Sequence, residues 1–145
     1  MANYVVDASV VIEYLISGPQ TSSAQSFFNQ LTDADQLVVP EFCLLEYTNV
    51  IWKQVRFNGL SRSDAKVLQN VLLNLKLRRA PMKRLLDRSL DIALDNVLAV
   101  YDSGYIALAL YYGYPGYPLV TIDQPQMQAA TAESVTLISI TGFNL

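Results

Sequence analysis

Residues 1–15 read MANYVVDASVVIEYL, and one carboxylate, Asp7, interrupts this otherwise apolar stretch. The apolar residues before it predict a short interior strand at 4–6, and those after it recur at helical spacing over 10–15. Burying an unpaired carboxylate costs free energy, so Asp7 requires a helix N-terminus, a cation or a metal ion. Aspartate is a favoured N-cap residue, and a simple cap of the following helix is therefore one explanation.

The same alternation of strands and helices continues along the chain. Apolar runs predict strands at 37–39, 119–122 and 135–138, with a candidate fifth at 75–79. Periodicity and flanking breakers predict helices at 22–31, 41–57, from 61 onward, from 81 onward, at 101–112 and at 124–130. Helix 41–57 carries an apolar stripe that includes Leu45, Ile51 and Trp52. This alternation predicts an α/β fold, a single three-layer α/β/α domain over 1–145 with a mostly parallel central sheet of four or five strands.

The composition excludes several classes of enzyme. The chain has no histidine and one cysteine, Cys43, which removes Ser-His-Asp and Cys-His catalysis and histidine-ligated zinc. The remaining oxygen ligands favour magnesium or manganese. No apolar run reaches the roughly 18–20 residues that span a bilayer. The N-terminus also lacks a signal-peptide pattern. We therefore expect a cytoplasmic protein that does not associate with membranes.

Basic residues are confined to the middle of the chain. All ten Lys and Arg residues lie between Lys53 and Arg88, although the net charge of the protein is −3. Such a segment can bind a polyanion locally, or it can form an ordinary solvated helical face. The charge pattern alone leaves both interpretations open.

Four acidic residues are predicted to approach one edge of the sheet. Asp7 and Asp123 each follow a strand, and ligands of open α/β sheets bind beyond the carboxyl ends of the strands. Glu46 lies in helix 41–57, and Asp102 lies near the start of helix 101–112. Converging carboxylates repel one another unless a divalent cation balances their charge. We interpret them as a metal-binding cluster, with four separate caps or solvated acids as the alternative.

Four segments resemble the PIN-domain ribonucleases, particularly the VapC-type toxins of toxin–antitoxin pairs. They are YVVDASVVIEYL, VVPEFCLLEYTNVIWK, VYDSGYIALAL and PLVTIDQPQM, and they stand in the order and spacing of the family. Two features depart from the family pattern: Ser103-Gly104, and the Gln-Pro pair that follows Asp123 where basic residues are common.

The resemblance implies a role for each matching residue. The four acids would bind Mg²⁺ or Mn²⁺ and act in catalysis; they are Asp7, Glu46, Asp102 and Asp123. Ser9 and Thr121 would position the metal, its water or the substrate phosphate, and Asn49 would support Glu46.

The activity implied is metal-dependent endonucleolytic hydrolysis of RNA phosphodiesters, leaving a 5′-phosphate. The RNA backbone would be held by basic residues of the middle segment, among them Lys53, Arg56, Arg78 and Arg79. The resemblance also implies a cognate antitoxin protein and a homodimer. The alternative is a PIN-like module that binds nucleic acid or protein without catalysis. A haloacid-dehalogenase-like phosphatase is disfavoured, because Asp7-Ala8-Ser9 lacks the second acid of Asp-x-Asp.

Overall fold

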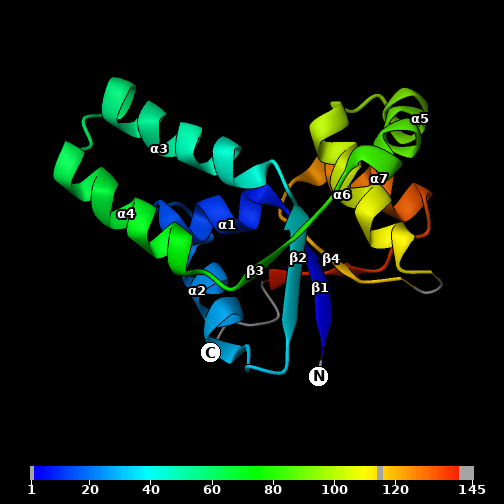
Figure 1. Ribbon diagram of the computed structural model, residues 1–145, viewed down its shortest axis with the longest axis horizontal. Coiled ribbons are helices and arrows are strands. Elements are labelled where there is room, and N and C mark those ends of the chain that lie inside the picture. Colours follow the sequence, from blue (N-terminus) through cyan, green and yellow to red (C-terminus); the bar gives the residue numbers. More distant parts are fainter. Residues whose placement is uncertain (1, 114–115, 141–145) are drawn as a thin grey trace.

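The computed structural model describes residues 2–113 and 116–140 (Figure 1). Its elements, in chain order, are β1 (Asn3–Val6), α1 (Ala8–Leu15), α2 (Thr21–Gln30), β2 (Gln36–Pro40), α3 (Cys43–Asn58), α4 (Arg62–Asn74), β3 (Leu77–Ala80), the 3-10 turn η1 (Lys83–Leu85), α5 (Leu86–Asn96), α6 (Val100–Tyr111), β4 (Leu119–Val120), α7 (Gln124–Ala132) and β5 (Leu137–Ile138).

The sheet has five strands in the order β3-β2-β1-β4-β5, and every neighbouring pair is parallel. This confirms the predicted parallel sheet and the candidate fifth strand, which is β3. β1 lies at the centre, where Tyr4 is in register with Leu37 of β2 and Val5 with Leu119 of β4. Because all strands run the same way, the residues that follow β1 and β4 emerge at one edge.

Helices cover both faces of the sheet, which confirms the three-layer prediction. Val5 and Val38 point into a core formed with α5, α6 and α7, whereas Val6 and Val39 point into a core formed with α1, α2, α3 and α4. This alternation follows the two-residue side-chain period of a strand. In Figure 1, the α3–α4 hairpin extends to one side of the sheet, and α5, α6 and α7 lie on the other.

β4 and β5 are shorter than the sequence predicts. The expected strand 119–122 ends at Val120 because the Thr121 hydroxyl turns to the Asp7 carboxylate and accepts the Asp123 N–H. The expected strand 135–138 begins only at Leu137. The Val135 N–H instead donates to the Ala130 carbonyl and closes the end of α7.

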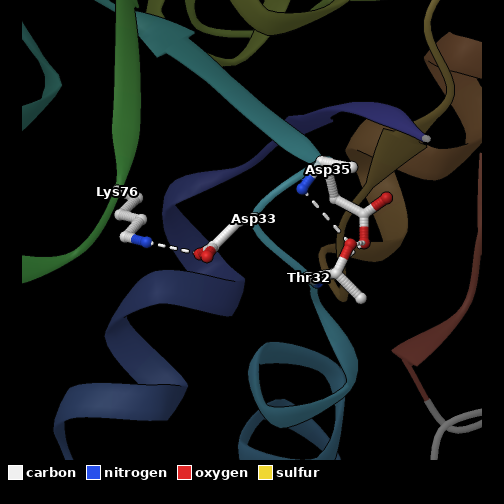
Figure 2. Close-up of polar contacts among 5 residues, drawn as sticks. Thr32, Asp33, Asp35 and Lys76 are labelled. Atoms are coloured by element: carbon white, nitrogen blue, oxygen red, sulfur yellow. Dashed lines mark hydrogen bonds and ion pairs between the residues drawn. The ribbon is translucent and has the colours of Figure 1, made fainter.

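The opposite edge of the sheet is fixed by the turn that leads into β2. The Asp35 carboxylate accepts hydrogen bonds from the N–H groups of Thr32 (2.9 Å) and Ala2 (2.8 Å), which lower its pKa and tie the start of β1 to this turn. Figure 2 shows Thr32 facing Asp35 and Lys76 reaching toward Asp33. Lys76 Nζ lies 2.6 Å from Asp33 Oδ1. The Lys76–Asp33 pair is exposed, so it contributes little to stability.

Within the described part of the chain, no single helix is both long and apolar enough to cross a membrane. The pair Lys83–Asn96 and Val100–Tyr111 meets the length and composition test only when taken together, with a 117° bend between its halves.

Candidate functional site

Asp7 caps α1 and also lies at the centre of a polar network. Its backbone N–H donates to the Val120 carbonyl (2.9 Å), which places the residue where β1 and β4 end. The side chain is 3% exposed. Its two oxygens accept hydrogen bonds from Ser9 N (3.0 Å), Thr121 Oγ1 (3.2 Å) and Gln126 Nε2 (3.0 Å). The N-cap explanation is therefore correct, but it accounts for only one of three donors.

Of the two hydroxyls expected near the site, that of Thr121 donates to Asp7, whereas Ser9 reaches Asp7 through its backbone N–H. Ser9 Oγ lies 3.3 Å from Thr121 Oγ1 and accepts the Ile122 N–H (3.2 Å). Thr121 Oγ1 also accepts the Asp123 N–H (3.1 Å). These bonds join the β1–α1 turn to the β4–α7 turn, which fixes the direction of the Asp7 carboxylate.

The other three acids begin helices at the same edge. Asp123 caps α7 by accepting the Gln126 N–H (3.0 Å), and Glu46 and Asp102 lie in the first turns of α3 and α6. Burial, followed by the charges of Asp7 and Asp102, raises the pKa of Glu46. Burial, followed by the charges of Asp7 and Asp123, raises the pKa of Asp102. The charges of neighbouring carboxylates therefore reach both Glu46 and Asp102.

The donor chemistry of this cluster suits a hard divalent cation, although the ligands are not drawn together. In residues 2–113 and 116–140, no group of three or more acidic or thiol side chains stands close enough to hold a metal ion unaided. Glu46 Oε1 is nonetheless buried without a hydrogen-bond partner among the described residues. Mg²⁺ usually keeps several waters and needs only one or two carboxylates. The residues thus fit an ion whose coordination shell water would complete.

Gln126 is a member of this network that the sequence interpretation missed. Its side chain is fully buried, and Nε2 donates both to Asp7 Oδ1 and to the Asp102 carbonyl (3.0 Å each). The pattern Asp123-x-x-Gln126 resembles a capping box, in which Gln126 would return to the Asp123 N–H. Thr121 Oγ1 already accepts that N–H, so the Gln126 amide is free to reach Asp7.

A buried pair of tyrosines lies close to the acidic cluster. The hydroxyls of Tyr47 and Tyr105 are 3.1 Å apart, and both rings are buried. Burial and the neighbouring Asp7 charge raise the pKa of Tyr105, and burial and Tyr105 raise that of Tyr47. Both phenols therefore stay protonated at neutral pH.

The remaining predicted residues do not form one patch. Lys53 and Arg56 are exposed on α3, whereas Arg78 and Arg79 are exposed on the edge strand β3. Arg78 and Arg79 border a separate cavity of about 170 Å³, and Arg78 Nη1 donates to Gln36 Oε1 (3.4 Å).

Asn49 is exposed beside Glu46. No hydrogen bond joins the two in the described chain, so the supporting role of Asn49 stays a prediction.

Comparisons with known proteins agree with the fold. Residues 4–132 match the model of the PIN domain. The structure is similar to PAE2754 from Pyrobaculum aerophilum, with a TM-score of 0.65 and 22% identity, covering 97% of this chain and 91% of that one. It is also similar to FitAcB from Neisseria gonorrhoeae, with a TM-score of 0.67 and 16% identity, covering 95% of this chain and 98% of that one. A third similar structure is that of FitAB bound to an IR36 DNA fragment. Its TM-score is 0.66 and its sequence identity 13%, and the match covers 98% of this chain and 96% of that one. No curated protein matches the sequence significantly.

Proposed function

The chain belongs to the PIN-domain family, whose members are typically metal-dependent nucleases, and from this premise we propose that it is a Mg²⁺- or Mn²⁺-dependent endoribonuclease that acts as the toxin of a toxin–antitoxin pair. The observation that carries the proposal is the placement of Asp7, Glu46, Asp102 and Asp123 at the carboxyl edge of the sheet, where burial and then the neighbouring carboxylate charges raise the pKa values of Glu46 and Asp102. Such a cluster is costly without a cation, because each carboxylate disfavours ionisation of its neighbours.

In this proposal the four acids hold the ion and the surrounding polar groups hold the acids. A divalent ion bound there would polarise a phosphoryl oxygen and lower the pKa of a bound water toward roughly 7–9. Asp7 cannot swing away from the site, because Ser9, Thr121 and Gln126 donate to its two oxygens. Glu46 has a buried oxygen still without a donor, which leaves it available as a ligand.

RNA as the substrate is supported by the basic residues outside the acidic edge. Lys53 and Arg56 on α3, and Arg78 and Arg79 on β3, are exposed and would contact backbone phosphates. Because the two pairs of basic residues lie on different elements, they favour an extended RNA strand over a compact ligand. Such contacts make binding strongly dependent on salt concentration.

The antitoxin partner follows from the resemblance to VapC-type toxins, and the cytoplasmic location remains the one expected from the sequence patterns. The homodimer has additional support in exposed apolar residues of α5, since Leu86, Leu90 and Leu94 recur every four residues. Sedimentation velocity of wild type and Leu90→Asp would test it, with dissociation of the variant as the expected result.

The central test is a manganese titration followed by electron paramagnetic resonance of the free ion. Wild type should bind saturably, whereas Asp7→Asn and Asp102→Asn should bind much more weakly. Asp91→Asn, which removes an exposed acid of α5, is the matched control and should resemble wild type.

Cleavage of a 5′-labelled RNA completes the test. Activity should require Mn²⁺ or Mg²⁺, vanish with EDTA and be lost in both site variants. Folded wild-type protein that binds RNA but neither binds Mn²⁺ nor cleaves would favour the alternative of a catalytically inactive binding module. Growth arrest on induced expression, absent in Asp7→Asn, would support the role of a toxin.

A further inference from the structure

A groove with a volume of about 510 Å³ runs between α3 and the first turn of α6, beside the acidic edge. Its walls include the aromatic rings of Phe42, Trp52 and Tyr101. Trp52 is 54% exposed and Tyr101 63% exposed, and the rings of Phe42 and Tyr101 meet edge to face with centroids 5.9 Å apart. Large aromatic side chains that remain this exposed at the wall of a groove offer flat surfaces for a planar ligand.

The groove also has a polar side. Glu46 and Asn49 line it together with the aromatic rings, and the Asn49 amide makes no hydrogen bond in the part of the chain that the structure describes. An amide that can both donate and accept suits the edge of a heterocycle. An unpaired nucleobase has two apolar faces and one such edge, and single-stranded RNA is recognised through stacking and base-edge contacts of this kind. A purely apolar peptide side chain would leave these polar groups without partners.

The groove includes one of the proposed catalytic acids, Glu46, and its α3 wall belongs to a helix that carries a cation farther along. Asn49, Trp52 and Arg56 follow at i, i+3 and i+7, which places them on one face of α3. The Arg56 guanidinium lies 5.3 Å from the centroid of the Phe57 ring. From Glu46 to Arg56 the helix advances about 15 Å, at about 1.5 Å per residue. A strand along this face would thus pass from a carboxylate, over an aromatic ring, to a positive charge.

We propose that this groove is a subsite for one unpaired base of single-stranded RNA, adjacent to the phosphodiester that Glu46 and its partners act on. Trp52 and Tyr101 stack on the base, Asn49 contacts its edge and Arg56 contacts the following phosphate. The inference rests on the proposed nuclease function and adds to it a requirement for a single strand at this position, because a paired base cannot enter the groove.

Trp52 is the only tryptophan of the chain, so its fluorescence reports directly on the groove. The protein is titrated at low ionic strength in EDTA, which prevents metal-dependent cleavage. The ligands are an eight-nucleotide RNA, an abasic oligomer with the same number of phosphates, and the RNA annealed to its complement. The expected result is saturable quenching by the single strand and much weaker quenching by the other two.

The contribution of the rings is measured by anisotropy of a labelled single strand. Trp52→Leu and Tyr101→Ala should each weaken binding by about 5- to 150-fold, the range measured for loss of one stacked base. Trp52→Phe should restore part of the affinity. Leu73→Ala, at another exposed apolar residue on α4, is the control and should bind as wild type. Circular dichroism establishes that each variant is folded.

Three results would overturn the inference. The abasic oligomer could quench Trp52 as well as the RNA does, which would indicate phosphate binding alone. The Trp52 and Tyr101 variants could bind the single strand with unchanged affinity. Trp52 emission could also shift with protein concentration in the absence of RNA, which would assign the groove to a second copy of the chain. A failure of the proposed function is distinguishable, because RNA would then quench Trp52 but no metal-dependent cleavage would occur.

Discussion

Gln126→Leu tests whether the buried amide orients the acidic cluster. Leucine has nearly the same size and no polar atoms, so the substitution removes the amide without opening a large cavity. It deletes one hydrogen bond to the ionised Asp7 carboxylate and one to the Asp102 carbonyl. It also deletes Gln126 Oε1, which is buried without a partner among the described residues.

The magnitude follows from these three changes. A hydrogen bond to a charged group contributes about 1.5–3 kcal/mol and one to a neutral group about 0.5–1.5 kcal/mol, whereas an unsatisfied buried polar atom costs about 1–3 kcal/mol. The losses exceed the relief, so the free energy of unfolding should fall by about 1–2 kcal/mol. For a domain of this size, that lowers Tm by roughly 2–8 °C. Mn²⁺ affinity should fall about 10- to 100-fold, as is typical when a group that orients a metal ligand is removed.

The assay combines urea unfolding with manganese titration on the same preparations. Gln69→Leu is the matched control, because Gln69 is also hydrogen-bonded through its side chain, to Thr48, but touches no carboxylate. That variant should lose at most about 1 kcal/mol and keep the Mn²⁺ affinity of wild type.

Two outcomes would refute the reasoning in different ways. A Gln126→Leu protein as stable as wild type, with unchanged Mn²⁺ affinity, would mean that the amide does not bridge Asp7 and Asp102 in solution. A loss of stability with unchanged affinity would mean that Gln126 only joins α7 to the core. In that case Ser9 and Thr121 would suffice to hold Asp7.

Other buried groups give outcomes that can be checked separately. Because the pKa values of Glu46 and Asp102 are raised on folding, the native state retains protons that the unfolded chain has released, and the free energy of unfolding falls as pH rises above about 4. Asp102→Asn should make this fall with pH less steep and should raise Tm in metal-free neutral buffer. An unchanged Tm in scanning fluorimetry would contradict repulsion between the carboxylates. Tyr47→Phe leaves the Tyr105 hydroxyl without its partner and should cost about 1–3 kcal/mol. Tyr105→Phe likewise leaves the Tyr47 hydroxyl without its partner, and in urea unfolding the double variant should cost less than the sum of the two single variants. Burial raises the pKa of the Cys43 thiol to about 11, so a thiol reagent should modify the native protein only as fast as it unfolds; rapid native labelling would show an open site.

The layered parallel sheet and the shared edge of two of the acids were predictable, because they depend on local patterns and one general rule. Apolar runs between helix breakers placed all five strands, and parallel strands end at a common edge. Asp7 and Asp123 therefore had to emerge together, and the Thr121 hydroxyl bonds both the Asp7 carboxylate and the Asp123 N–H. The predicted end of β4 and the predicted start of β5 were wrong. Both depend on which backbone N–H groups form hydrogen bonds with a side chain or a helix end instead of a neighbouring strand.

The groove and Gln126 could not be predicted in the same way. Periodicity shows which residues of α3 share a face, but not which part of that face another element covers. The predicted apolar stripe is split in the structure, where Ile51 is buried and Leu45 and Trp52 are exposed. Gln126 contacts Asp7 across 119 positions of sequence, and its capping-box spacing pointed to a different partner. Both features depend on the packing of distant elements.

The question raised by Asp7 has a specific physical answer. All three of its hydrogen-bond donors are neutral: a backbone N–H, a hydroxyl and an amide. The single ion pair among the described residues, Lys76–Asp33, lies at the opposite edge, so no ion pair in this part of the chain involves the acidic cluster. Dipoles can orient Asp7, yet burial and then the neighbouring carboxylate charges still raise the pKa values of Glu46 and Asp102. We therefore propose that a cation from outside the protein compensates this charge, and oxygen ligands favour a hard divalent ion for that position.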